Sequence, residues 1–467
     1  LGLEGVLVDL GERGAAELTA LSAWEIMNVP TGAILDLRDA MSRLAEGDPR
    51  VAPLLKRYSI GMQGYLGFHR LFEAVTGEAL AEPVVLLPST KHYSWSKIAN
   101  LLGMGQGQLL ELPLDANYRI DPARFAAVTE RLLNDRVPVL ALMTVLGSTE
   151  TGSIDQIARL FEVKAEAAAA GLEMYCHVDG AYGGYATAMF RDPQGRWVSW
   201  SPYGSDVAAS FKALPLTDSI TIDPHKLGYA PYPAGALIFA DRRLREFLST
   251  DAPYVFYQEG DGQHHAIGQY IVEGSKPGVA AAAVWLNHRV MPLDTSGYGA
   301  LIGGTVASAK ALKEALMGFK SAAGFKLIPL NEPDLNLVTF IAVPPGVRSV
   351  AELNRFNEAL YQRFAVDAER VVFTYEFLVS KTAFDVTKYE AGLKARLEPA
   401  LLAMLEDTVP LTVLRTTIMN PFVAAAIEDG SYFRELLSTL ESEMRSVAAE
   451  QGLTAEATVR PGQRIKG

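Results

Sequence analysis

The chain has 467 residues, and its 42 Lys and Arg against 54 Asp and Glu give a formal net charge of −12. An apolar share of 49% can fill large buried cores, and a chain of this length folds into roughly two to four domains. The acidic balance has no basic stripe, which excludes nucleic acid and anionic membrane surfaces as partners. The single cysteine, Cys176, excludes an internal disulfide, and no apolar run approaches the roughly eighteen residues that span a bilayer. We therefore expect a cytoplasmic protein of enzyme size.

The first part of the chain, residues 1–80, has a helical pattern. Leu35, Leu37, Met41 and Leu44 recur at helical spacing, and a second apolar run follows a break at Gly47-Asp-Pro-Arg50. We predict a helical N-terminal segment with an insert.

Residues 81–300 alternate between apolar strands and helices. The strands are expected at 83–88, 108–112, 137–143, 174–178, 220–222 and 235–240, with helices at 94–102, 122–133 and 154–170. Apolar strands that alternate with helices indicate an α/β fold whose sheet is covered on both faces. Functional residues of such a fold lie where its strands end.

The remaining residues, 301–467, predict a smaller α/β domain. Its strands are expected at 325–329, 336–342, 371–378 and 411–419, and its helices at 350–365 and 422–450.

Lys226 lies on a predicted bend. The β-formers of 220–222 run into Asp223-Pro224, where the strand must stop because proline has no N–H for the ladder. A second strand resumes at Gly235. A lysine held at a strand end between apolar runs is suited to form a Schiff base, although most lysines near turns are simply solvated.

Three further strand ends carry polar residues. Asp179 ends the strand 174–178 and is followed by small residues, among them Ala181, that let a ligand approach the backbone. His92 follows the strand 83–88 and could stack on a planar ring, and Ser148 and Thr149 follow the strand 137–143. With Lys226, Asp179 suggests pyridoxal phosphate, because an acid beside the pyridine nitrogen makes the ring an electron sink.

Two other kinds of site are excluded. Gly103-Met-Gly-Gln-Gly107 lacks the third glycine of a dinucleotide fingerprint and leads into a strand. His177 and His264-His265 lack the spacing and the partners of a zinc site, so we predict no metal.

The chain resembles the pyridoxal phosphate-dependent group II amino-acid decarboxylases, in particular the bacterial tyrosine decarboxylases. The resemblance lies in His-Val-Asp-Gly-Ala-Tyr-Gly-Gly at 177–184, Ser-Ile-Thr-Ile-Asp-Pro-His-Lys at 219–226 and Thr-Lys-His-Tyr-Ser-Trp at 90–95, and it covers nearly the whole chain. It implies the aspartate aminotransferase-like, type I fold, with a large, mostly parallel seven-stranded sheet domain and a small C-terminal α/β domain. It also implies a homodimer whose active site lies at the subunit interface.

The resemblance assigns cofactor contacts residue by residue. Lys226 would form the Schiff base with pyridoxal 5'-phosphate, Asp179 would pair with the pyridinium nitrogen, and His92 would stack over the ring. His225, toward the phosphate, and Thr149 would be further cofactor contacts, and the neighbouring Ser148 and Ala181 join this set.

The resemblance also assigns residues to the reaction. Tyr254 would donate the proton to the α-carbon after carbon dioxide leaves, while Tyr232 and Thr417 would lie near the substrate side chain. Residues upstream of Leu1 are expected to supply the loop that clamps the phosphate. The implied reaction is decarboxylation of an L-amino acid, with an aromatic substrate such as tyrosine preferred and glutamate as the alternative. A non-catalytic dimer of the same fold, and an aminotransferase or aldolase-type lyase, are the competing hypotheses.

Overall fold

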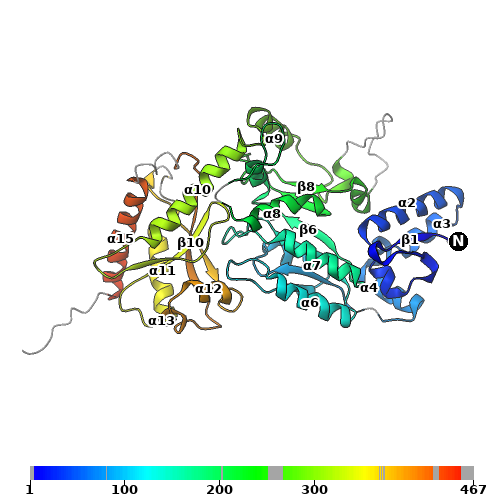
Figure 1. Ribbon diagram of the computed structural model, residues 1–467, viewed down its shortest axis with the longest axis horizontal. Helices are drawn as coiled ribbons and strands as arrows, with labels where there is room; N and C mark the ends of the chain where they lie inside the picture. Colours follow the sequence, from blue (N-terminus) through cyan, green and yellow to red (C-terminus); the bar gives the residue numbers. More distant parts are fainter. Residues whose placement is uncertain are drawn as a thin grey trace, which may run out of the picture. The chain divides into compact units, whose positions relative to one another are not determined.

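The computed structural model describes residues 5–79, 81–200, 203–250, 267–367, 369, 371, 374–423 and 431–453 (Figure 1). The chain divides into two compact units. The first comprises Leu1–Pro113, Arg119–Thr149 and Ile154–Gly299, and the second comprises Leu114–Tyr118, Glu150–Ser153 and Ala300–Gly467. Within the described residues, no helix combines the length and the apolar character that a bilayer crossing requires.

The first unit begins with a short hairpin and four helices. Strands β1 (Leu7–Asp9) and β2 (Ala15–Glu17) pair antiparallel. The helices are α1 (Ala23–Met27), α2 (Thr31–Gly47), α3 (Val51–Tyr58) and α4 (Ile60–Thr76). The expectation of a purely helical segment over 1–80 was therefore wrong at its start, because Gly11 and Gly14, both at positive φ, turn the chain back on itself.

A six-stranded sheet forms the centre of the first unit. Its order is β4-β3-β5-β6-β7-β8, for strands β3 (Val84–Pro88), β4 (Leu109–Leu112), β5 (Val139–Val145), β6 (Tyr175–Asp179), β7 (Ser219–Ile222) and β8 (Ala236–Phe239). All neighbours pair parallel except β7 and β8, which are antiparallel. Seven strands were expected in this sheet, but the described part of the chain forms six. Among these, β8 is an edge strand that pairs only with β7.

Helices connect the strands of this sheet. They are α5 (Ser94–Leu101), α6 (Pro122–Asn134), α7 (Ile157–Ala169) and α8 (Ser205–Ala213), with a shorter 3-10 turn η4 (Gly184–Phe190). After β8 come the 3-10 turns η6 (Arg242–Leu248) and η7 (Ile267–Tyr270) and helix α9 (Val279–Val290). On one face of the sheet, Leu86 and Leu142 pack with Phe125 of α6 and Leu160 of α7. On the other face, Leu87 and other strand residues pack with Trp95 of α5. Because successive side chains of a strand point to opposite faces of the sheet, the strands contribute to two separate hydrophobic cores.

The second unit has a four-stranded antiparallel sheet of order β11-β12-β10-β9. Its elements are α10 (Tyr298–Met317), β9 (Lys326–Pro329), β10 (Leu337–Val343), α11 (Val350–Phe364), β11 (Ser380–Phe384), α12 (Glu390–Arg396), α13 (Pro399–Leu402), β12 (Leu411–Thr417) and α15 (Ser431–Gln451). Residues 374–378, expected in a strand, are not in one. The strand lies at β11 instead, whose alternating exposure marks a half-covered strand that an apolar-run criterion misses.

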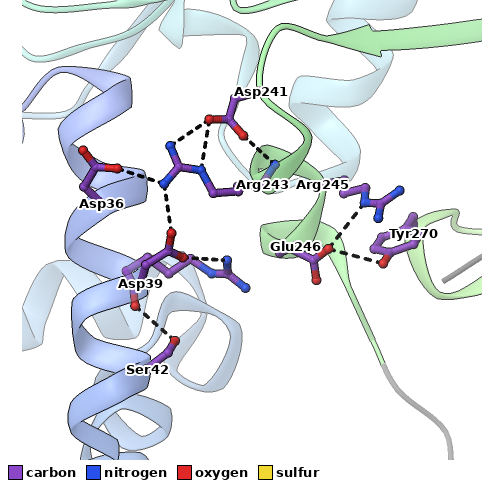
Figure 2. Close-up of polar contacts among 9 residues, drawn as sticks. Asp36, Asp39, Ser42, Asp241, Arg243, Arg245, Glu246 and Tyr270 are labelled. Atoms are coloured by element: carbon purple, nitrogen blue, oxygen red, sulfur yellow. Dashed lines mark hydrogen bonds and ion pairs between the residues drawn. The ribbon is translucent and has the colours of Figure 1, made fainter. Parts of the chain in front are cut away.

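Ion pairs of Arg243 join helix α2 to the segment after β8. Arg243 of η6 places Nη1 2.8 Å from Asp36 Oδ1 and 2.9 Å from Asp39 Oδ2, both on α2, and Nη2 2.7 Å from Asp241 Oδ2 (Figure 2). The hydrogen bond from the Arg243 side chain is the main cause that lowers the pKa of Asp241. The Asp241 carboxylate therefore stays ionised at neutral pH, and this pairing is lost only as the pH falls through that lowered pKa.

Replacing Arg243 should loosen helix α2. In Arg243→Gln we expect faster amide hydrogen exchange over residues 31–47, because two acidic side chains of α2 lose their shared cation. High salt should narrow the difference from the wild type by screening the ion pairs. Arg245→Gln is the matched control, since Arg245 pairs with the neighbouring Glu246 and stacks over Tyr270, away from α2 (Figure 2). Equal exchange in all three proteins would contradict this role for Arg243.

Candidate active site

Four loops meet at the carboxyl edge of the large sheet. His92 follows β3, Thr149 follows β5, Asp179 ends β6 and Lys226 follows β7. The chain moves from β3 out to β4 and returns to β5 on the other side of β3, so the sheet reverses its winding between β3 and β5. A ligand of an open α/β sheet binds outside the carboxyl ends of its strands at such a point.

Backbone hydrogen bonds tie these loops to one another. The N–H of Leu146 donates to the carbonyl of Asp179 at 2.9 Å, and the N–H of Gly183 donates to the carbonyl of Leu146 at 2.8 Å. The N–H of Asp223 donates to the carbonyl of Ala181 at 3.2 Å. The loops after β5, β6 and β7 therefore hold their positions together.

A cavity of about 960 Å³ lies at this edge. Five residues that the sequence assigned to the site line it, namely His92, Thr149, Asp179, Ala181 and Lys226. The wall also includes Thr90, Trp95, His177, Ser219, Thr221, Asp223 and Leu237. The size is within the range of pockets that hold small molecules and cofactors.

The bend that carries Lys226 is a hydrogen-bonded turn. The N–H of Lys226 donates to the carbonyl of Asp223 at 3.0 Å, with Pro224 in the second position, where its fixed φ is favoured. The turn brings Lys226 Nζ to 3.0 Å from Asp223 Oδ2. His225 Nε2 lies 3.7 Å from the same oxygen, so one carboxylate oxygen faces both the amine and the imidazole.

Gly228, two residues after Lys226, packs too tightly for a side chain. A Cβ on Gly228 would lie 2.5 Å from Cζ of Tyr185 and 2.6 Å from the carbonyl oxygen of Pro224. The buried Tyr298 donates its hydroxyl to the Gly228 carbonyl at 2.7 Å. Burial raises the pKa of Tyr185 to about 12, so this phenol is neutral at physiological pH. The bend is thus fixed by contacts on both sides of the lysine.

Asp179 lies on the cavity wall next to a neutral histidine. Asp179 Oδ1 accepts the N–H of Ala181 at 3.2 Å. His177, two residues earlier on β6, has Nδ1 2.8 Å from Ser219 Oγ and Nε2 3.2 Å from Thr221 Oγ1. Burial lowers the pKa of His177, which keeps its ring uncharged at neutral pH.

His92 is held in one orientation. Burial is the main cause that lowers its pKa, and the charge of Lys226 acts in the same direction. The N–H of Ser94 donates to His92 Nδ1 at 3.3 Å, and Ser94 Oγ lies 2.8 Å from the same nitrogen. Because Nδ1 accepts a backbone N–H, the proton of the neutral ring is on Nε2. A flat, uncharged ring on the cavity wall suits stacking on an aromatic ligand.

The other predicted site residues lie elsewhere. Ser148 is buried beside Thr149, and His225 stacks on Tyr232 with ring centroids 3.8 Å apart instead of lining the cavity. The Tyr232 side chain is exposed. Thr417 ends β12 in the second unit. Tyr254 lies outside the described residues.

Thr90, Asp223 and Thr221 also belong to the cavity wall, and sequence reasoning did not single them out. Asp223 was noted only at the end of a strand and within the motif at 219–226, although its spacing of three from Lys226 is that of a turn closed by a hydrogen bond. Thr221 pairs with Asp179 across β6 and β7, a register that only the paired strands reveal.

The donor set fits an aromatic aldehyde. An amine, a carboxylate and a neutral imidazole, from Lys226, Asp179 and His92, surround one cavity. An amine can form an imine with an aldehyde, a carboxylate can hold a protonated ring nitrogen, and an imidazole can stack. These are the groups that pyridoxal phosphate requires. Among the residues that the structure describes, no group of three or more His, Cys, Asp or Glu side chains could hold a metal ion.

Comparison with known proteins gives two family matches. The model described as "Pyridoxal-dependent decarboxylase conserved domain" matches residues 70–343, and "Tyrosine decarboxylase, C-terminal" matches residues 312–444. L-tyrosine decarboxylase of Levilactobacillus brevis is 32% identical over 452 residues, which cover 92% of this chain and 68% of the relative. L-tyrosine decarboxylase of Enterococcus faecalis is 31% identical, over 91% of this chain and 69% of the relative. The chain thus spans about two thirds of the length of these relatives.

Solved structures share the fold. Mouse CSAD has a TM-score of 0.57 at 19% identity, covering 83% of this chain and 67% of that one. Catharanthus roseus tryptophan decarboxylase in complex with L-tryptophan has a TM-score of 0.55 at 16% identity, covering 81% and 65%. The fold is the aspartate aminotransferase-like, type I fold that the family resemblance implied.

Adding a methyl group at the bend should disturb the site. In Gly228→Ala we expect a loss of about 1–3 kcal/mol in the free energy of unfolding, the usual cost of overpacking, together with weaker pyridoxal phosphate binding. Denaturant unfolding and a cofactor titration measure the two effects. Gly278→Ala is the control, because its Cβ would meet nothing within 4 Å and its φ is ordinary. Equal stability of the two variants would refute the crowding argument.

Proposed function

Since the chain belongs to the pyridoxal-dependent decarboxylase family, we propose that it decarboxylates an aromatic L-amino acid, tyrosine or a ring-hydroxylated analogue. The family makes the protein a pyridoxal phosphate-dependent carboxy-lyase that acts on amino acids. The aromatic preference rests on one observation, the match of residues 312–444 to the tyrosine decarboxylase C-terminal model. The names of the Levilactobacillus and Enterococcus relatives support it. An acidic substrate such as glutamate is the alternative.

The proposed roles follow from the chemistry of each side chain. When bound, pyridoxal phosphate would supply an electron sink for the α-carbon as carbon dioxide leaves it. Lys226 supplies the amine that holds the cofactor, and Asp179 keeps the ring nitrogen protonated. His92 stacks on the ring. Asp223 Oδ2, 3.0 Å from Lys226 Nζ, holds this side chain in position on the cavity wall.

Further contacts are proposed from the resemblance. Thr149, Ser148, Ala181 and His225 bind the cofactor, His225 on its phosphate side. Tyr232 and Thr417 lie near the substrate side chain in this proposal.

A second copy of the chain completes the proposed enzyme. The first unit exposes large apolar side chains at Ile98, Leu101 and Leu102 around the end of α5, and at Leu237 and Ile238 of β8. Three of them, Ile98, Leu102 and Leu237, also line the cavity, and exposed apolar side chains that gather in one place mark sites of association. We place the homodimer in the cytoplasm, in keeping with a single, buried cysteine.

Release of carbon dioxide from a panel of L-amino acids tests the function. We expect the highest kcat/KM with tyrosine or its hydroxylated analogue, and none from Lys226→Ala, which lacks the amine. Lys212→Ala, on helix α8, is the control and should keep full activity. A preference for glutamate would overturn the aromatic assignment. A borohydride-fixed pyridoxyl group on Lys226 without carbon dioxide from any amino acid would favour a non-catalytic protein.

Tyr254 separates decarboxylation from the other reactions of this fold. We propose that its phenol donates the proton to the α-carbon, and a positioned acid contributes roughly 10²–10⁴-fold to a rate. Tyr254→Phe should therefore lower amine formation by about 10²-fold, with carbonyl by-products in its place, measured by product chromatography. Turnover that survives in Tyr254→Phe would fit an aminotransferase or an aldolase-type lyase instead.

A further inference from the structure

Thr90 has a buried hydroxyl that makes no hydrogen bond to the described part of the chain. The residue lies two positions beyond β3 and two before His92, and only 4% of its surface is exposed. Its Oγ1 is buried and has no hydrogen-bond partner among the residues that the structure describes. Thr90 nevertheless lines the cavity shared by Asp179 and Lys226.

A hydroxyl in this position needs an explanation. Most buried polar groups of folded proteins are hydrogen-bonded, because a buried donor without a partner has lost its water and gained nothing in return. Valine has nearly the shape of threonine and would fill the same space without this penalty. A partner that is not part of the described chain, but that enters the cavity, accounts for the hydroxyl.

We propose that the Thr90 hydroxyl donates a hydrogen bond to an anionic oxygen of the bound cofactor. This inference rests on the proposed function, since it requires pyridoxal phosphate on Lys226. The cofactor is favoured over the amino acid because Thr90 is almost wholly buried and close in sequence to His92, the proposed stacking residue. The cofactor stays bound between turnovers, and it is therefore the ligand that we expect a buried hydroxyl near the stacking residue to contact. Thr90 is thus a cofactor contact that neither its motif nor its strand position reveals.

Thr144 offers a matched control. It lies on β5, is fully buried, and its Oγ1 also has no partner among the described residues. It is not on the cavity wall. Removing the Thr144 hydroxyl therefore has the same internal effect as removing that of Thr90, without a possible loss of ligand contact.

The test is a pyridoxal phosphate titration of the full protein stripped of cofactor, followed by absorbance. In Thr90→Val we expect Kd for the cofactor to rise about tenfold, the size of one hydrogen bond to a charged group. The Tm of the cofactor-free protein should stay the same or rise. Thr90→Ser, which keeps the hydroxyl, should bind within about twofold of the wild type. Thr144→Val should keep the wild-type Kd. If Thr90→Val does not fold, the Kd ratio of Thr90→Ala to Thr90→Ser makes the same comparison.

The outcomes separate this inference from the function on which it rests. If borohydride fixes no pyridoxyl group on Lys226 of the wild type, the proposed function itself has failed. If the wild type loads normally and Thr90→Val has an unchanged Kd, the cofactor contact is refuted. In that case, a tenfold rise in KM for the amino acid would reassign the hydrogen bond to the substrate carboxylate. An equal rise of Kd in Thr144→Val would mean that the effect is structural, and would also overturn the proposal.

Discussion

The parallel pairing of β3, β5, β6 and β7 is the constraint on which the site depends. In a parallel sheet every strand ends at the same edge, so side chains far apart in the sequence must meet there. His92, Thr149, Asp179 and Lys226 lie on four separate loops, and all four line one cavity. Backbone hydrogen bonds between the loops after β5, β6 and β7 add a second level of order. Because these bonds use main-chain groups, they hold the edge in place independently of the side chains that perform the chemistry.

The second constraint is crowding around the lysine. Gly228 has no room for a side chain, and Tyr298 holds its carbonyl from a buried position. These contacts fix the backbone just after the bend, and Lys226 lies on the cavity wall. Asp223 then fixes the amine with an ion pair.

Much of the large sheet could be predicted from the sequence, because its strands are apolar runs bounded by Gly, Pro and Asp. Asp179 and Lys226 could be located as polar residues at strand ends. Prediction from the sequence failed where the sequence pattern of an element is weak, or where a residue's role depends on distant parts of the chain. The hairpin of β1 and β2 has strands of only three residues, and β11 alternates polar with apolar residues instead of forming a run. The roles of Asp223 and Thr221 depend on a turn and on a strand register, which composition does not encode.

By itself, the sequence determined the class of fold, the amine and the acid, because strand-end residue types and apolar periodicity are local properties. It also carried the motifs by which the family is recognised. Only the tertiary structure decided which of the predicted groups share a wall: it placed His92, Thr149, Asp179 and Lys226 around one cavity, and it turned His225 toward Tyr232. It alone distinguished the hydroxyl of Thr90, which has no partner in the described part of the chain and belongs to a cavity-lining residue, from that of Thr144, which is not on the cavity wall. The physical reason is that burial and hydrogen-bond satisfaction are properties of packed neighbours, and those neighbours come from distant parts of the chain.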